Sequence, residues 1–139
     1  MNVIFTDIDG VLNYSYKNQW IDKSIDIYNR LCEEFDLKPV ISSTWRTNHS
    51  KKDLQHVFNY YGITTPIYDY TPILPEQPRG VEIETWIFEN NPNKWIVIDD
   101  QVTDILPFVS NVVKIRGWIG LSEEDYVIIS KILSNGRIS

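Results

Sequence analysis

Short apolar runs alternate along the chain with longer segments in which apolar residues recur at every third or fourth position. Runs rich in Val, Ile and aromatic residues occur at 3–6, 39–42, 66–70, 95–98 and 112–115. They predict short buried strands, whereas the three-and-four spacing elsewhere predicts amphipathic helices over 22–36, 52–61, 80–90 and after residue 122. The alternation predicts an α/β fold, a three-layer Rossmann-like arrangement with a mostly parallel five-stranded central sheet and helices on both faces.

Turn and capping residues set the limits of these elements. Asp22 is the predicted N-cap of the first helix, Gly62 ends the second, and Ser122 is the predicted N-cap of the last. Residues 14–20 are polar and aromatic without a clear period, which predicts a loop or flap beside the first strand. The first two strands are separated by room for only one helical crossover, so we expect a single domain over 1–139 with no separate cap domain.

Charge and cysteine usage narrow the classes of function. Thirteen basic and nineteen acidic residues give a net charge of −6, which argues against loose binding along nucleic acid but leaves a local basic site open. Cys32, the single cysteine, cannot form an internal disulfide, and its place on the apolar face of a helix predicts core packing. Without an apolar run of membrane-spanning length or a signal segment, we expect a cytoplasmic protein with no membrane partner, either a monomer or a small homo-oligomer.

Acidic residues follow the first and the fourth predicted strands. Asp7 and Asp9 come directly after the first, two positions apart and therefore on one side, and Gly10 lets the chain turn sharply away. Asp99 and Asp100 end the fourth. Because the carboxyl ends of parallel strands meet at one edge of a sheet, we expect these carboxylates to converge. Neighbouring carboxylates repel one another and lose hydration, and a divalent cation is the usual compensation.

Four short segments carry a resemblance that covers nearly the whole chain. They are DIDGVLN at 7–13, SSTWR at 42–46, RGVEI at 79–83 and VIDDQ at 97–101. These segments are similar to the pattern of DGVLN, SSxWR, RGxEI and a strand ending in DD that marks the small capless haloacid dehalogenase-like (HAD) domains of RNA repair proteins. The resemblance implies a phosphomonoester hydrolase that depends on Mg²⁺ and works through an aspartyl-phosphate intermediate.

The same resemblance gives roles to the acids. It implies that Asp7 attacks phosphorus and that Asp9 serves as general acid and then as general base. Mg²⁺ would be held by Asp7, Asp100 and a backbone carbonyl at Asp9, with Asp99 as a further candidate ligand. Asp104 is expected to support the site or to cap the turn that follows.

Candidate phosphate-binding residues are implied in the same way. Ser42 best fits the hydroxyl position after the second strand, and Ser43 stays an alternative. Arg79, where HAD enzymes generally hold Lys, is the candidate cation beside the nucleophile, with Lys94 as the fallback. Arg46 offers a forked guanidinium to the same phosphate. The full set of candidates is Ser42, Ser43, Arg46, Arg79 and Gly10 for substrate binding, and Asp7, Asp9, Ser42 and Arg79 for catalysis.

The substrate is less determined than the reaction. A site without a cap domain is open to solvent, and the RNA-repair resemblance favours a phosphorylated polynucleotide end, notably a 3′ phosphate. Lys51 and Lys52 either contact a phosphate backbone or form an ordinary solvated face. A small-metabolite or nucleotide phosphatase is the alternative, and a catalytically silent HAD-like binding domain is a second, which the intact pair of Asp7 and Asp9 disfavours. A receiver domain would need its phosphoacceptor on the third strand, which offers only Asp69.

Overall fold

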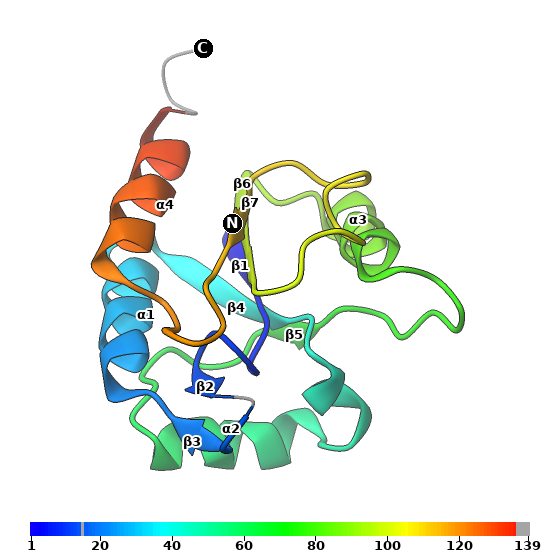
Figure 1. Cartoon of the computed structure of the whole chain (residues 1–139). Helices are drawn as coiled ribbons and strands as arrows, with labels where there is room; N and C mark the ends of the chain where they lie inside the picture. Colours follow the sequence, from blue (N-terminus) through cyan, green and yellow to red (C-terminus); the bar gives the residue numbers. More distant parts are fainter. Residues whose placement is uncertain (15, 136–139) are drawn as a thin grey trace.

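The computed structural model describes residues 1–14 and 16–135, and they form three layers around one sheet (Figure 1). On one face, α1 (Asp22–Phe35) and α4 (Glu123–Asn135) pack against each other and against the sheet, and α3 (Arg79–Asn90) covers the other face. A fourth helix, α2 (Lys51–Tyr60), and the short 3₁₀ helix η1 (Thr44–Thr47) follow the second sheet strand. None of the described helices is both long and apolar enough to span a bilayer.

Five parallel strands make the central sheet, in the order β5-β4-β1-β6-β7. Their bounds are Asn2–Thr6 for β1, Leu37–Ile41 for β4, Asp69–Tyr70 for β5, Lys94–Asp99 for β6 and Val112–Lys114 for β7. The predicted α/β class and five-stranded sheet are confirmed, and every pairing in that sheet is parallel. Between β1 and β4 the described residues form only α1 and a small hairpin, which leaves no cap domain.

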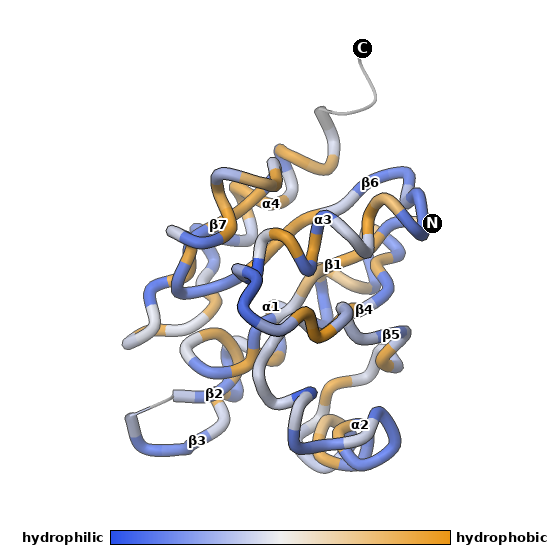
Figure 2. The backbone as a smooth tube through the Cα atoms, turned by 90° about the vertical axis from the view of Figure 1, so that its right-hand side faces the viewer, coloured by the Kyte–Doolittle hydropathy of each residue, from blue (hydrophilic) through white to orange (hydrophobic). Residues whose placement is uncertain are grey.

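Alternation of side chains along the strands separates two hydrophobic cores. Ile4, Ile96 and Ile98 face α1 and α4, whereas Phe5 and Val97, one position away, face α3. All five are fully buried, and burial of such a side chain contributes about 1.5–3 kcal/mol. Figure 2 shows hydrophobic colour along β1 and alternating hydrophobic and hydrophilic stretches along α4. Both faces of the sheet are therefore covered, as parallel sheets require.

Three local predictions need correction. The N-cap of α1 is Ile21 and not Asp22, which instead supplies a favourable negative charge to the first turn. The predicted loop at 14–20 contains a hairpin of two short strands, β2 (Asn13–Tyr14) and β3 (Gln19–Trp20). Residue 15 lies outside the described residues. The third strand is limited to β5, and the segment before it contains Pro66, which has no N–H for a sheet ladder.

The capping prediction for the last helix is confirmed. Ser122 Oγ accepts from the Asp125 N–H at 3.2 Å, and the Asp125 carboxylate accepts from the Ser122 N–H at 2.9 Å. This reciprocal pair is a capping box, which satisfies donors that the first turn of α4 leaves without helical partners. Gly62 directly follows α2 and its C-cap Tyr61, with the positive φ of 91° that glycine favours at a helix end.

Candidate active site

The parallel register places polar side chains in one row across three strand ends. Phe5 lies opposite Val40 on one side and Val97 on the other, so two residues further on Asp7 lies between Ser42 and Asp99. The ladder continues to this row, because the Asp7 N–H donates to the Ile98 carbonyl at 3.2 Å and the Ser42 N–H donates to the Thr6 carbonyl at 3.1 Å. Asp7, Ser42 and Asp99 are all buried and lie on the α3 side of the sheet.

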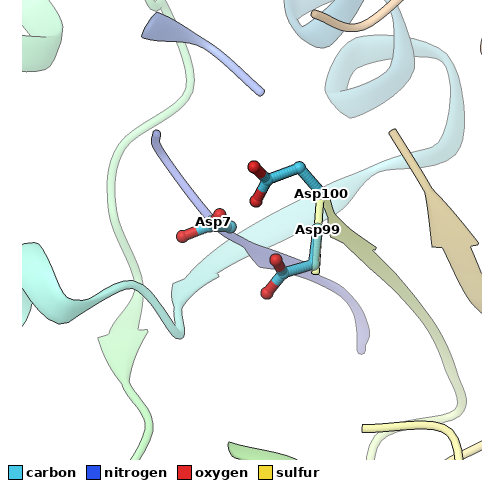
Figure 3. A group of neighbouring side chains, drawn as sticks. All are labelled: Asp7, Asp99 and Asp100. Carbon is cyan, nitrogen blue, oxygen red and sulfur yellow. The ribbon is translucent and has the colours of Figure 1, made fainter. Parts of the chain in front are cut away.

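Three carboxylates converge beside this row. Asp7, Asp99 and Asp100 offer oxygen atoms that all lie within 4.8 Å of one another, from the ends of β1 and β6 (Figure 3). Burial, together with the Asp99 charge, raises the pKa of Asp7 to about 9, although the Arg79 charge opposes the shift. Burial also raises the pKa of Asp99, again against the effect of Arg79. The charge of Arg79 therefore does not fully compensate the ionised forms of Asp7 and Asp99.

A hard divalent cation fits the donor set. All three groups are carboxylates, which Mg²⁺ prefers over nitrogen or sulfur ligands. Gly10 and Gly117 shape the surroundings, since a Cβ at Gly10 would lie 2.3 Å from Asp100 Oδ2 and one at Gly117 would lie 3.0 Å from it. Gly10 also has a φ of 83°, so a larger residue there is both strained and in conflict with Asp100.

Gly10, a candidate substrate-binding residue, lies in the turn after β1. Its N–H donates to the Asn13 carbonyl at 2.7 Å and is therefore used within the turn. The residue makes room for Asp100, which the sequence alone did not indicate because the two are far apart along the chain.

Arg79 is the cation that meets the acids. It begins α3, and its Nη1 lies 2.6 Å from Asp99 Oδ2 and 3.4 Å from Asp7 Oδ1. Burial lowers the pKa of Arg79, but the charges of Asp99 and Asp7 outweigh this and leave the pKa raised. The fallback, Lys94, begins β6 at the opposite end of the strand, where its Nζ donates to the Leu133 carbonyl at 2.7 Å. The geometry therefore favours Arg79 over Lys94.

Arg46 has a different role from the one expected. Its five guanidinium N–H groups are matched by five acceptors, which are the carbonyls of Ser42, Ser43, Thr71 and Pro72 and the carboxylate of Glu82. The side chain is 3% exposed, and Nη2 lies 2.8 Å from Glu82 Oε1. No donor is left for a phosphate. We call these six residues the Arg46 cluster.

Asp9 is held by two side chains that the sequence analysis did not assign to the site. Its Oδ1 accepts from Asn13 Nδ2 and from Trp45 Nε1, each at 3.1 Å. Trp45 is itself fixed between Trp20, edge to face at 5.6 Å, and His49, stacked at 5.1 Å. A Trp beside the site in SSTWR was the available signal, because an enclosed indole N–H usually finds an acceptor.

The hydroxyl groups after β4 differ in their availability. Ser43 Oγ accepts from the Trp45 N–H at 3.1 Å and caps η1, so it is already used. Ser42 Oγ is buried and has no hydrogen-bond partner among the described residues. Thr44, which the sequence analysis did not single out, lines the adjoining cavity. Thr44 therefore faces the cavity, whereas Ser42 has a hydroxyl without a described partner but is fully buried and does not line the cavity.

A cavity of about 270 Å³ opens over the acids. We call it the acid cavity, and its walls are formed by Asp7, Asp9, Thr44, Arg79, Asp100, Gln101 and Asp104. Asp104 accepts from the first N–H groups of α3, through Oδ2 from Arg79 at 3.4 Å and through its carbonyl from Gly80 at 3.0 Å. It therefore supplies acceptors to the first turn of α3 from the cavity wall, in agreement with the expected supporting place beside the site. Lys51 lies outside this cavity and forms an exposed ion pair with Asp69 at 3.6 Å, and Lys52 is exposed.

Comparison with known proteins agrees with this arrangement. The family model described as "HAD domain in Swiss Army Knife RNA repair proteins" matches residues 3–126. The match spans the four segments that carry the resemblance and every residue of the acid cavity. No curated protein matched the chain.

Proposed function

The chain belongs to the HAD domain family of Swiss Army Knife RNA repair proteins, and from this premise we propose that it is a magnesium-dependent phosphatase that forms an aspartyl-phosphate. Membership makes it a HAD-type phosphohydrolase domain. The observation that carries the finer proposal is the meeting of Asp7 and Asp100 from two separate strands, with Arg79 beside them.

Asp7 and Asp9 divide the covalent chemistry. An Asp7 carboxylate oxygen attacks phosphorus in line, and the bond from phosphorus to the ester oxygen breaks as Asp9 gives that oxygen a proton. Water then attacks the aspartyl-phosphate while Asp9 takes its proton, which restores both acids and releases inorganic phosphate. The bonds from Asn13 and Trp45 to one Asp9 oxygen support this role, because they fix the carboxylate at the wall of the cavity.

Mg²⁺ would be held by Asp7, Asp100 and the backbone carbonyl of Asp9. When bound, Mg²⁺ would supply positive charge to the acids and to the transferring phosphoryl oxygens. Asp99 is the weaker candidate as a ligand, since its carboxylate already accepts from Arg79 at 2.6 Å and from the Gln101 N–H at 2.9 Å. Asp7 needs such compensation to attack as a carboxylate, because its pKa is raised to about 9 in its absence.

Arg79, Ser42 and Thr44 complete the proposed phosphate site. The Arg79 guanidinium lies 3.4 Å from the nucleophile, close enough to share its donors with a phosphoryl oxygen in the cavity. The Ser42 hydroxyl lies in the same row as Asp7 and has no partner within the described residues, although Ser42 is fully buried and does not line the cavity. Charge-stabilising groups of this kind contribute most to phosphate-ester hydrolysis, which is among the slowest uncatalysed reactions.

We propose a phosphorylated polynucleotide end, notably a 3′ phosphate, as the substrate. The acid cavity of about 270 Å³ is smaller than the roughly 300–1,000 Å³ typical of small-molecule pockets. It suits a terminal phosphoryl group while the rest of the substrate lies outside. The name of the family supports RNA as the source of that end.

Phosphate release by the purified chain tests the proposal. With MgCl₂, it should hydrolyse para-nitrophenyl phosphate, and Asp7→Asn should abolish the activity, as should excess EDTA. Asp26→Asn is a matched control, because Asp26 is an exposed acid on α1 far from the site, and it should keep full activity. A rate for the unaltered chain no higher than that of Asp7→Asn would refute the enzyme. A panel of 3′- and 5′-phosphorylated oligonucleotides and small phosphate esters then ranks the substrates.

A further inference from the structure

A second, larger cavity adjoins the acid cavity and is not used by the chemistry above. Its volume is about 510 Å³, nearly twice that of the acid cavity, and the two share Asp100 and Gln101 in their walls. The remaining walls are Tyr16 from the hairpin and the segment Lys114, Ile115, Arg116, Gly117 and Trp118 after β7. We call this cavity the β7 groove. A substrate whose phosphate occupies the acid cavity therefore has a place for its next part.

The turn that carries Trp118 is fixed and stands next to the acids. The N–H groups of Ile119 and Gly120 both donate to the Arg116 carbonyl, at 2.9 and 2.8 Å, so residues 116–120 form a hydrogen-bonded turn. Gly117 lies so close to Asp100 that an added Cβ would be 3.0 Å from its carboxylate. The backbone of the turn thus holds Trp118 next to Gly117, which lies close to the proposed metal ligand.

The groove presents two large aromatic side chains to solvent. Trp118 is 69% exposed and Tyr16 is 67% exposed, although aromatic residues of this size are usually buried. Neither residue belongs to either hydrophobic core. Exposed aromatic faces in the wall of an open cavity are typical of sites on which nucleobases stack.

Cations accompany these aromatic residues although the chain as a whole carries a charge of −6. Lys114 and Arg116 line the groove, and Lys17 Nζ lies 5.5 Å from the centre of the Tyr16 ring. Arg116 pairs only loosely with Glu124, at 3.5 Å between two exposed side chains, so it can exchange that partner at little cost. The combination of cations and stacking faces is what a nucleic-acid strand requires.

We propose that the β7 groove binds the single-stranded polynucleotide segment that adjoins the terminal phosphate, with bases on Trp118 and Tyr16 and backbone phosphates at Lys114 and Arg116. This inference rests on the proposed function, because the acid cavity must hold that terminal phosphate. A phosphoprotein could also pair with the cations, but it offers no series of flat rings for two exposed aromatic side chains. The favoured ligand is therefore a polynucleotide end of two or more nucleotides.

Binding without turnover provides the test. In the Asp7→Asn chain, the affinity for a 3′-phosphorylated, 5′-fluorescein single-stranded oligonucleotide is measured by anisotropy. Trp118→Ala should weaken binding five-fold or more, since one stacked base contributes about that much or more. Lys114→Ala combined with Arg116→Ala should lower the slope of log K against log[salt] by about 0.7 for each backbone phosphate that the chain no longer neutralises. Phe88→Ala is the matched control, because Phe88 is 88% exposed on α3, and binding should be unchanged.

The outcomes separate the groove from the hydrolase. A decrease in affinity in Trp118→Ala equal to that in Phe88→Ala would overturn the groove, and so would Trp118-dependent binding of a phosphoserine peptide as tight as that of the oligonucleotide. Hydrolysis of para-nitrophenyl phosphate tests the hydrolase alone. If that activity is absent while oligonucleotide binding depends on Trp118, the proposed function fails and the groove stands. In the active chain, Trp118→Ala should raise KM for the oligonucleotide several-fold more than KM for the small ester.

Discussion

Two arginines at the same edge of the sheet show that the same type of side chain has a structural role in one place and is available to a ligand in another. The side chains of Arg46 and Arg79 are both largely buried. Arg46 pairs with the buried acid Glu82, and Arg79 pairs with the buried acid Asp99. Arg46 has a protein acceptor for every guanidinium N–H, whereas the side-chain contacts of Arg79 in the described structure all involve Nη1. An arginine whose donors are all matched is structural, and one with donors to spare beside a cavity is available to a ligand.

Helix α3 connects the two arginines. Arg79 is its first residue, and Glu82, in its first turn, accepts from Arg46 and from the Leu74 N–H at 2.9 Å. Between them Gly80 lets the Asp104 carbonyl approach, because a Cβ there would lie 2.7 Å from that oxygen. Within the segment RGVEI, Arg79 thus contacts the acids of the site and Glu82 binds Arg46. The Arg46 cluster holds in place the helix that positions Arg79.

The largest expected effect is on stability, from removing the structural arginine. Arg46→Ala leaves the Glu82 charge buried without its cationic partner and the carbonyls of Ser42, Thr71 and Pro72 without their guanidinium donor. These losses should cost about 3–5 kcal/mol in the free energy of unfolding. Urea denaturation measures it. Arg30→Ala is the control, because its ion pair with Glu123 is exposed and should contribute less than about 1 kcal/mol.

A second variant keeps this prediction testable if Arg46→Ala does not fold. Arg46→Lys retains the charge but has three donors in place of five, so it should fold with a smaller loss of stability. A loss in Arg46→Lys no greater than that in Arg30→Ala would contradict the structural role.

The next effect is on activity, from removing the other arginine. Arg79→Ala should lower kcat for para-nitrophenyl phosphate by about 10²–10³-fold, equivalent to about 2.7–4 kcal/mol, since it removes a positioned charge beside the reacting oxygens. Arg79→Lys should recover part of the rate, because Lys supplies the charge without the fork. Steady-state kinetics at saturating substrate measures both. A kcat unchanged in Arg79→Ala would remove Arg79 from the site and with it the contrast with Arg46.

The sequence predicted the residues that lie together at the ends of parallel strands. It did not predict side-chain contacts between segments that are far apart along the chain. Parallel strands carry their carboxyl ends to one edge, so Asp7, Asp99 and Asp100 were predictable as a group from short apolar runs. Arg46 was misjudged because the donors that match a phosphate also match backbone carbonyls. Its acid, Glu82, lies 36 positions away and reads locally as an ordinary polar residue of a helix. The bond from Trp45 to Asp9 also spans 36 positions, and no local period encodes it.

The charge imbalance at the site predicts a smaller, pH-dependent effect. Because the pKa of Asp7 is raised to about 9 in the fold from an ordinary value of 3.8, folding favours its protonated form. That stabilisation is complete below about pH 4 and is lost as pH rises toward 9. The charged groups that face the Asp7 carboxyl group are Asp99, Asp100 and Arg79. In EDTA, thermal unfolding should therefore show stability falling steadily between pH 5 and 9.

Asp7→Asn and Mg²⁺ should each remove this slope. The amide carries no charge at any of these pH values. The unfolding temperature of Asp7→Asn should therefore change less with pH than that of the unaltered chain. Mg²⁺ should raise the unfolding temperature at pH 8 in the unaltered chain more than in Asp7→Asn. An equal slope in both chains without metal would mean that Asp7 is not the titrating group.

The smallest expected effect concerns the uncharged indole N–H of Trp45, which donates to Asp9, whereas the two arginines pair with their acids as cations. Trp45→Phe keeps an aromatic ring in the cluster but removes the N–H that donates to Asp9 Oδ1 at 3.1 Å, leaving Asn13 as the remaining side-chain donor. A hydrogen bond to a charged group contributes about 1.5 kcal/mol or more, so kcat should fall roughly ten-fold, while KM for para-nitrophenyl phosphate stays within about two-fold. Trp20→Phe is the matched control, because Trp20 packs against the same ring and its indole does not contact Asp9 in the described structure. It should lose stability and keep kcat. Equal losses of kcat in the two variants would make Trp45 a packing residue, and the position of Asp9 would then depend on Asn13 and the turn after β1.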